Sequence, residues 1–244
     1  MTRLLNTLLL ALCCLPMDAA PNDPTLFAAY LAQDVDTWRK VVEQTDCSTR
    51  DALADLVNYE YGYIGFCLAR NDETQATTTI ARTHKHLETL QTMGYDEAML
   101  NMYRSALAAF ELSMNHSKFA TLGIKSVKLA HLAAQQAPKN PYVLSLNGNT
   151  YFYRPALFGG SKSKAIELYT ESVRQFEAQK LTQNNWNYIA TLLTLAQAYE
   201  KTGELAKAKA VCNKLLGIVP NFVYLRDTYY PALLKKLTIN THQP

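Results

Sequence analysis

The sequence predicts an all-α protein: a right-handed superhelical solenoid of about five antiparallel helix hairpins. Apolar residues recur with helical spacing almost throughout, and no segment alternates cleanly enough to be a strand. Helix stops are plain at four places: Gly94, residues 137–141, Gly203 and Pro220. The short connections make successive helices antiparallel neighbours, about ten in all. One hairpin cannot bury its own apolar face, so the hairpins are expected to stack.

Two helix starts carry capping signals. Ser48 is followed three residues later by Asp51, and Asp72 is followed three residues later by Gln75. Side chains of this kind accept hydrogen bonds from the free N–H groups of a first helical turn. We therefore expect helices to begin directly after Ser48 and Asp72.

Composition restricts the class of protein. The 244 residues are 48% hydrophobic and 18% charged, with a net charge of +3. These values are typical of a folded globular chain. Since no block of basic residues occurs, nothing favours nucleic acid or anionic lipid as a partner. The 15 tyrosines suit helix packing with polar rims, and also contact surfaces.

The first twenty residues differ from the rest of the chain. Residues 1–20 combine a basic start, an apolar run, a proline and small residues at the end, which predicts a secretory signal peptide too short to span a bilayer. Residues 21–244 then form one domain, exported to the periplasm or cell envelope, with no membrane span. Alternatively, Cys13 or Cys14 is the attachment point of a lipid, because the preceding residues loosely match a bacterial lipobox.

Three cysteines follow the leader: Cys47, Cys67 and Cys212. An odd number allows at most one internal disulfide. Cys67 and Cys212 fall on apolar helix faces, where cysteine usually acts as a small buried hydrophobe. The absence of a C-x-x-C motif in the sequence argues against a redox or zinc-knuckle role.

Two segments repeat one pattern, that of a helix–turn–helix unit with fixed large and small positions. In residues 185–220 these positions hold Leu192, Leu195, Ala196, Tyr199, Ala208 and Cys212. In residues 141–178 they hold Leu144, Gly148, Tyr151, Ala165 and Tyr169. The small residues let the two helices of a hairpin approach closely, while the large ones fill the seam. Only Cys212 is unusual, because it stands where a large side chain is expected.

This pattern resembles the tetratricopeptide repeats of exported bacterial envelope proteins, over residues 140–222. More narrowly, it is similar to proteins with a P-x-x-x-G-G expansion inside a repeat, here Pro155, Gly159 and Gly160. The segment YEYGYIGF (59–66) is also similar to the N-terminal region of that group. The resemblance implies a scaffold or adaptor with no catalysis of its own and no cofactor. The periplasmic T component of tripartite transporters carries a similar turn and is a second candidate.

The expanded turn has two interpretations. In one, the backbone N–H groups of residues 159–161, with Lys162 and Lys164, bind an anion. In the other, Pro155 ends a helix, glycines supply positive φ and Ser161 caps the next helix. We favour the capped turn, because the motif is not that of a phosphate-binding loop and no strand precedes it. The turn would then present a contact surface formed by Pro155, Phe158, Gly159, Gly160 and Lys162.

The histidines offer little chemistry. His84 and Glu88 share a helix face, with His86 nearby, but no third metal ligand is apparent. His116 and His131 are isolated, and no local grouping indicates a nucleophile with its base. We therefore expect no metal, no cofactor and no catalytic residue; a hydrolase or metal-binding protein is the rival hypothesis.

A concave surface lined by the first helix of each repeat is the expected binding groove. Its predicted residues are Tyr142, Ser145, Asn149, Phe152, Leu193, Gln197 and Glu200. Aromatic and amide side chains at these positions suit an extended peptide or a partner helix. Alternatively, the protein's own C-terminal helix, residues 222–237, fills the groove. The sequence thus predicts a non-enzymatic protein–protein interaction module whose protein or peptide partner it does not identify.

Overall fold

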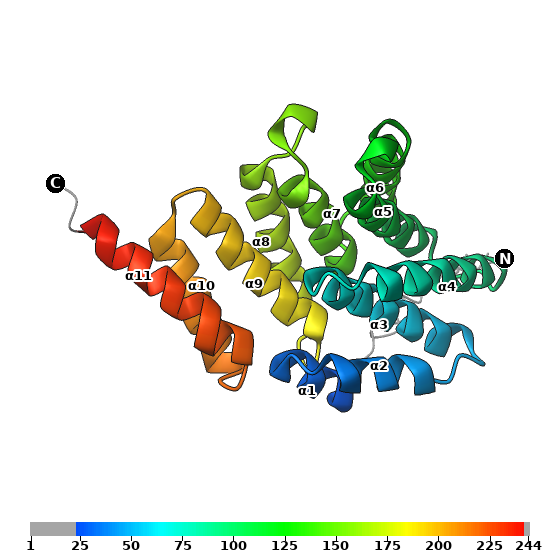
Figure 1. Cartoon of the computed structure of the whole chain (residues 1–244), viewed down its shortest axis with the longest axis horizontal. Helices are drawn as coiled ribbons and strands as arrows, with labels where there is room; N and C mark the ends of the chain where they lie inside the picture. The colour runs from blue at the N-terminus through cyan, green and yellow to red at the C-terminus, as the bar shows by residue number, and fades with distance from the viewer. Residues whose placement is uncertain (1–22, 242–244) are drawn as a thin grey trace, which may run out of the picture.

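The computed structural model describes residues 23–241, which form eleven α-helices and no strand (Figure 1). The all-α prediction is confirmed. The first ten helices pack in successive pairs. These pairs are α1 (Pro24–Ala32) with α2 (Val35–Gln44), α3 (Arg50–Ala69) with α4 (Glu73–Thr92), α5 (Glu97–Met114) with α6 (Ile124–Gln136), α7 (Pro141–Tyr153) with α8 (Lys162–Ala178), and α9 (Trp186–Lys201) with α10 (Leu205–Ile218). The predicted signal peptide, with Cys13 and Cys14, lies outside the described residues.

Short helical turns join some of these elements. Between α5 and α6 lie η1 (His116–Lys118) and η2 (Phe119–Gly123), and η3 (Ala156–Phe158) lies between α7 and α8. After α10, η4 (Leu225–Tyr229) leads into α11 (Tyr230–Thr241), which packs on α10. No helix within residues 23–241 is long and apolar enough to cross a membrane.

Most helices begin behind a polar side chain that accepts a hydrogen bond from the first turn. Asp72 does so for α4, accepting from the N–H of Gln75 at 3.1 Å, as predicted. The expectation for Ser48 was wrong. Thr49 caps α3 by accepting from the N–H of Ala52, because the hydroxyl of Ser48 is engaged with Asp46. Gly94 and Gly203 do end helices, each with φ in the left-handed region (70° and 81°).

Close helix approach in the α7–α8 pair depends on Gly148. A Cβ atom added there would lie 2.5 Å from Cε1 of Tyr169, closer than two carbon atoms can approach. Tyr169 is fully buried and occupies this space. Ala165, Ala196 and Ala208 are also fully buried, which places the small residues of both repeats inside the molecule.

The N-terminal helices contact elements far beyond their neighbours in the chain. The Tyr30 ring of α1 lies 5.8 Å from that of Trp186 in α9 and 5.3 Å from that of Phe222, which follows α10. Figure 1 shows α1 beside the N-terminal end of α9. α1 therefore packs against the last hairpin as well as against α2, and this differs from the stacking of neighbours expected from the sequence.

The three cysteines within residues 23–241 are free thiols. Cys67 and Cys212 are buried, and Cys47 is exposed. Burial raises the pKa of the Cys212 thiol to about 12, so this side chain is a packing group rather than a nucleophile.

Candidate functional site

Three of the predicted groove residues lie inside the molecule rather than on an open surface. Tyr142, Ser145 and Phe152 are buried. The amide of Asn185 donates to the Tyr142 hydroxyl at 2.7 Å, and the Ser145 hydroxyl is 2.7 Å from that of Thr191. Helix α9 thus covers this face of α7. These side chains are unavailable to a partner, so the prediction that they line an open groove needs correction.

The other four groove residues are half-buried: Asn149 on α7 and Leu193, Gln197 and Glu200 on α9. Lys236 of α11 pairs with Glu200. Burial raises the pKa of Glu200, but the Lys236 ammonium and further hydrogen bonds outweigh it, and the net pKa is lowered. Helix α11 therefore contacts the predicted groove at Glu200, its α9 end.

A buried polar network, which the sequence analysis missed, joins α3 to α5 and α9. The side-chain amide of Asn58 donates to the Tyr103 hydroxyl at 2.8 Å. Its oxygen accepts from the Trp186 indole at 2.8 Å and from Asn187 at 3.0 Å. A fully paired buried network of this kind fixes one arrangement of the helices that it joins. Its only signal in the sequence is an asparagine within the apolar stripe of α3.

Five tyrosines from separate elements gather near this network and form what we call the tyrosine cluster. Its members are Tyr30 of α1, Tyr61 of α3, Tyr153 of α7, Tyr169 of α8, and Tyr224 just before η4. The Tyr169 hydroxyl donates to Asn149 at 2.7 Å, and the Asn149 amide donates to the Tyr61 hydroxyl at 3.2 Å. One of the four half-buried groove residues is therefore part of the same hydrogen-bonded set.

Within the cluster, burial raises the pKa of the phenols of Tyr30, Tyr61 and Tyr169. Burial raises the pKa of Tyr61 to about 12, and nearby Tyr153 adds to the rise. Burial likewise raises the pKa of Tyr30, with contributions from Tyr153, Tyr61 and Tyr224. Groups that disfavour each other's ionisation lie close together. Neutral phenols offer hydroxyls that donate and accept hydrogen bonds, and aromatic faces, but no base for catalysis near pH 7.

The cluster reaches the surface at Tyr153, which is 66% exposed. Tyr224 is half-buried, whereas Tyr30 and Tyr169 are buried. The arrangement is thus a rigid aromatic base with one exposed tyrosine at its edge. An exposed tyrosine held by a buried aromatic base is typical of a contact surface.

The expanded turn between α7 and α8 uses its own hydrogen-bond donors internally. The N–H groups of Gly159, Gly160 and Ser161 donate to the carbonyls of Ala156, Pro155 and Tyr151. The Ser161 hydroxyl caps α8 by accepting from the N–H of Lys164. These bonds favour the capped turn over an anion site, because the N–H groups that would hold an anion are already paired.

The two glycines of the turn serve different purposes. Gly159 has a φ of 85°, which a residue with a side chain adopts at a cost. Gly160 is not in the left-handed region, but a Cβ atom there would lie 1.8 Å from the carbonyl oxygen of Arg154. The sequence analysis expected positive φ at both glycines, and it was right for Gly159 only.

Lys162 points back into the protein rather than outward as part of a contact surface. Its ammonium donates to the Phe152 carbonyl and lies 4.5 Å from the centre of the Phe152 ring. Burial lowers its pKa, and the nearby charge of Lys201 lowers it further. The exposed part of the turn is formed instead by residues 155–159.

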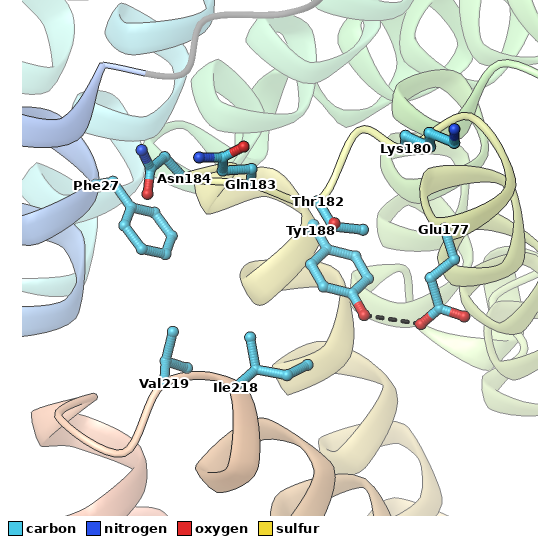
Figure 2. A pocket seen from close by; sticks show the side chains of 9 residues that line it. All are labelled: Phe27, Glu177, Lys180, Thr182, Gln183, Asn184, Tyr188, Ile218 and Val219. Carbon is cyan, nitrogen blue, oxygen red and sulfur yellow. Dashed lines mark hydrogen bonds between the residues drawn. The ribbon is translucent and has the colours of Figure 1, made fainter.

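A hollow of about 540 Å³ lies between α1, the α8–α9 connection and the end of α10 (Figure 2). Its lining residues are Phe27, Glu177, Lys180, Thr182, Gln183, Asn184, Tyr188, Ile218 and Val219. The Tyr188 hydroxyl donates to Glu177 at 2.8 Å, and Lys214 pairs with the same carboxylate. Glu177 is therefore already paired, and the other charged residue of the lining is the exposed Lys180.

Two histidines of α4 form hydrogen bonds with carboxylates of neighbouring helices. His84 contacts Glu111 at 2.8 Å, and His86 contacts the buried Glu60 at 2.9 Å. Glu60 also accepts from Arg82. Thus His84 pairs with α5 rather than with Glu88. No group of three or more His, Cys, Asp and Glu side chains within residues 23–241 is placed to hold a metal ion.

These features define an all-helical protein of packed helix pairs. A scan against protein-family models gives no match, and a search of curated protein sequences gives none either. Among solved structures, the chain is similar to the HusA haemophore from Porphyromonas gingivalis, with a TM-score of 0.54 and 23% sequence identity. The similarity covers 74% of this chain and 87% of that one. It shows a shared fold, with a protein described as a haemophore rather than as a tetratricopeptide-repeat protein.

Proposed function

We propose that this protein is an exported, non-enzymatic binding protein of the bacterial periplasm or envelope, with a tetratricopeptide-like solenoid architecture. The observation that carries the proposal is the tyrosine cluster, with Tyr153 exposed at its edge. Tyr61 and Tyr169 of the cluster are held by hydrogen bonds to Asn149, and Tyr30 packs against the rings of Trp186 and Phe222. Rigid aromatic surfaces bind partners at low entropic cost.

The partner is a protein or peptide that contacts Tyr153 and the exposed parts of Leu193 and Gln197. Tyrosine supplies apolar area and a hydroxyl, while glutamine supplies both a donor and an acceptor for a peptide backbone. The protein's own α11 already covers the Glu200 end through Lys236. The binding surface is therefore shorter than the groove predicted from the sequence.

Site-specific photocrosslinking tests this proposal. A photoreactive phenylalanine analogue replaces Tyr153 in the native host, and the envelope fraction is irradiated. We expect one dominant protein adduct. The matched control places the same analogue at Ile239, an exposed apolar residue of α11, where that adduct should be absent. Identical adducts at both positions, or no adduct at Tyr153, would contradict the proposal.

A second candidate is a planar apolar ligand such as haem. Tyrosine is among the side chains that can bind haem iron, and Tyr153 combines exposure with a neighbouring Phe152 ring at 4.9 Å. The similar structure belongs to a haemophore. If haem is the ligand, haemin titration gives a saturable shift of the Soret band that Tyr153→Phe alters and Tyr199→Phe leaves unchanged.

The rival functions make different predictions. A periplasmic T component should co-purify with a substrate-binding protein of a transporter. A hydrolase should turn over an ester or phosphate substrate, and a metal protein should retain stoichiometric metal after purification. A crosslinked partner at Tyr153 without turnover or retained metal supports the binding protein over both enzyme and metal protein.

A further inference from the structure

Charge is strongly segregated along the chain. Residues 112–166 contain seven Lys and Arg residues and no Asp or Glu. The whole chain has 24 basic and 21 acidic residues, so the remainder carries 17 basic against 21 acidic. No consecutive basic block exists, so this segregation does not stand out in the sequence. The segment nevertheless folds into neighbouring elements, from the end of α5 to the start of α8.

The same segment presents exposed apolar side chains at the ends of two adjacent hairpins. Leu157 is 88% exposed and Ile124 is 68% exposed, while Phe158 and Val127 are also exposed. The rings of Phe158 and Phe119 lie 4.0 Å apart, which joins the α7–α8 turn to the α5–α6 connection. In Figure 1 both connections lie at the top of the view. We call this surface the tip face; it comprises Phe119, Ile124, Val127, Leu157 and Phe158.

Free positive charges flank the tip face. Lys118, Lys125 and Lys128 are exposed, and within residues 23–241 none of them has an ion-pair partner. The nearest acidic residues in the sequence are Glu111 and Glu167. Both are already engaged, with His84 and Lys164 respectively. The surface is therefore apolar at its tip and positively charged around it.

We propose that the tip face docks the protein peripherally on an anionic lipid bilayer. The α7–α8 turn protrudes from the body of the molecule (Figure 1). Its most exposed large apolar side chain is that of Leu157. Protruding apolar side chains enter the boundary between headgroups and acyl chains, while surrounding lysines are attracted to anionic headgroups. An acidic protein would supply the charge complementarity, but it would have to cover a convex tip rather than fill a hollow. The charge and the shape together favour the bilayer, which corrects the expectation that nothing favours anionic lipid.

Vesicle co-sedimentation tests the proposal. The purified full chain is mixed with vesicles of phosphatidylcholine alone, or of phosphatidylcholine with one third phosphatidylglycerol. We expect binding to the anionic vesicles that weakens with salt. The triple variant Lys118→Gln, Lys125→Gln, Lys128→Gln should bind about a hundredfold more weakly, since each lysine near an anionic surface contributes about fivefold. Leu157→Ser with Ile124→Ser should weaken binding at least tenfold.

Matched control variants distinguish docking through the tip face from a general loss of charge or of exposed apolar surface. Lys40→Gln, Lys85→Gln, Lys209→Gln makes the same charge change on other surfaces, and Ile239→Ser removes an exposed apolar side chain elsewhere. Neither should weaken binding more than twofold, and circular dichroism should show every variant folded. All variants share one N-terminus, so residues 1–20 contribute equally to each.

Two results would overturn the inference. One is binding that is equal on neutral and anionic vesicles or equally weakened by the controls. The other is tight, lysine-dependent binding to polyglutamate without binding to anionic vesicles, which would assign the surface to an acidic protein. Loss of crosslinking at Tyr153 would leave the inference standing, because the tip face and the tyrosine cluster are made of different residues.

Discussion

The α7–α8 and α9–α10 hairpins both have a small residue in the first helix, but the residue at the facing position of the second helix is large in one and small in the other. In α7–α8 the first helix has Gly148 and the second has Tyr169 facing it. In α9–α10 the corresponding positions hold Ala196 and Cys212, both fully buried. Cys212 lies close enough to Tyr229 and Tyr230 to affect their pKa values. We infer that the volume filled by a large side chain in the first hairpin is supplied in the second by the elements that follow α10.

This difference explains why the unusual Cys212 is tolerated. An interior packs to nearly constant density, so a small residue in one helix requires a large one nearby. The last hairpin has a following helix to provide it, with Tyr229 buried beside Cys212. The repeat pattern therefore specifies a volume to be filled, and the residue that fills it can come from outside the repeat.

Exchanging the residue types at positions 169 and 212 should give the largest change in the free energy of unfolding. Tyr169→Cys leaves a cavity against Gly148 and removes the hydrogen bond to Asn149, so we expect a loss of about 4 kcal/mol in the free energy of unfolding. Cys212→Tyr should cost about 2 kcal/mol by overpacking. Urea denaturation measures both, and Tyr169→Phe isolates the hydroxyl at about 1 kcal/mol. A Tyr169→Cys variant as stable as wild type would show that the α7–α8 pair does not need the Tyr169 ring to fill its interior.

Enlarging the small residue tests the same contact from the other helix. Gly148→Leu should cost about 3 kcal/mol, because even a Cβ atom collides with the Tyr169 ring. Ala208→Leu should cost about 2 kcal/mol in the second hairpin. Gly65→Ala is the control: nothing lies within 4 Å of its added Cβ, so higher helix propensity should stabilise by up to about 1 kcal/mol. Unchanged melting temperatures for both enlarged variants would refute the repeat register.

The turns of the two hairpins differ in what surrounds their glycines. Gly203 ends α9 with positive φ and open space around it, so Gly203→Ala should cost only about 1 kcal/mol. Gly160→Ala should cost about 2 kcal/mol, since the added Cβ meets backbone that must move. Thermal unfolding of both variants gives the comparison. If Gly203→Ala is the more damaging, strain in φ outweighs the backbone collision.

Local patterns in the sequence predict the all-α class, the Asp72 cap and the glycine helix stops, because each depends on neighbouring residues. They do not predict which face of α7 is covered. Tyr142 and Ser145 were placed on an open surface because helical spacing gives relative directions and not the identity of the packing partner. The Asn58 network is not predicted for the same reason, because it joins Asn58 to Asn187 across 129 positions of sequence. The tip face was missed because its charges are scattered in sequence and gathered only by folding.

The smallest expected change in the free energy of unfolding concerns lysines at the start of the second helix in each hairpin. Lys162 lies over the Phe152 ring and Lys207 lies over the Tyr199 ring, at 4.5 and 5.4 Å from the ring centres. Only Lys162 is partly buried and also donates to a backbone carbonyl. Lys162→Ala should therefore cost about 1 kcal/mol, the value of one hydrogen bond and a partly screened cation–π contact.

The controls for this last comparison are Lys164→Ala and Lys207→Ala. Lys164 is exposed and paired only with Glu167, so its removal should change stability by no more than about 0.5 kcal/mol. Lys207 is fully exposed, and its removal should have no measurable effect. Millimolar phosphate at constant ionic strength should leave the melting temperature of every variant unchanged, because the turn has no free N–H groups at residues 159–161. A phosphate-dependent rise in melting temperature that Lys162→Ala abolished would restore the anion-site interpretation. It would show that Lys162 gives up its hydrogen bond to the Phe152 carbonyl in order to bind an anion.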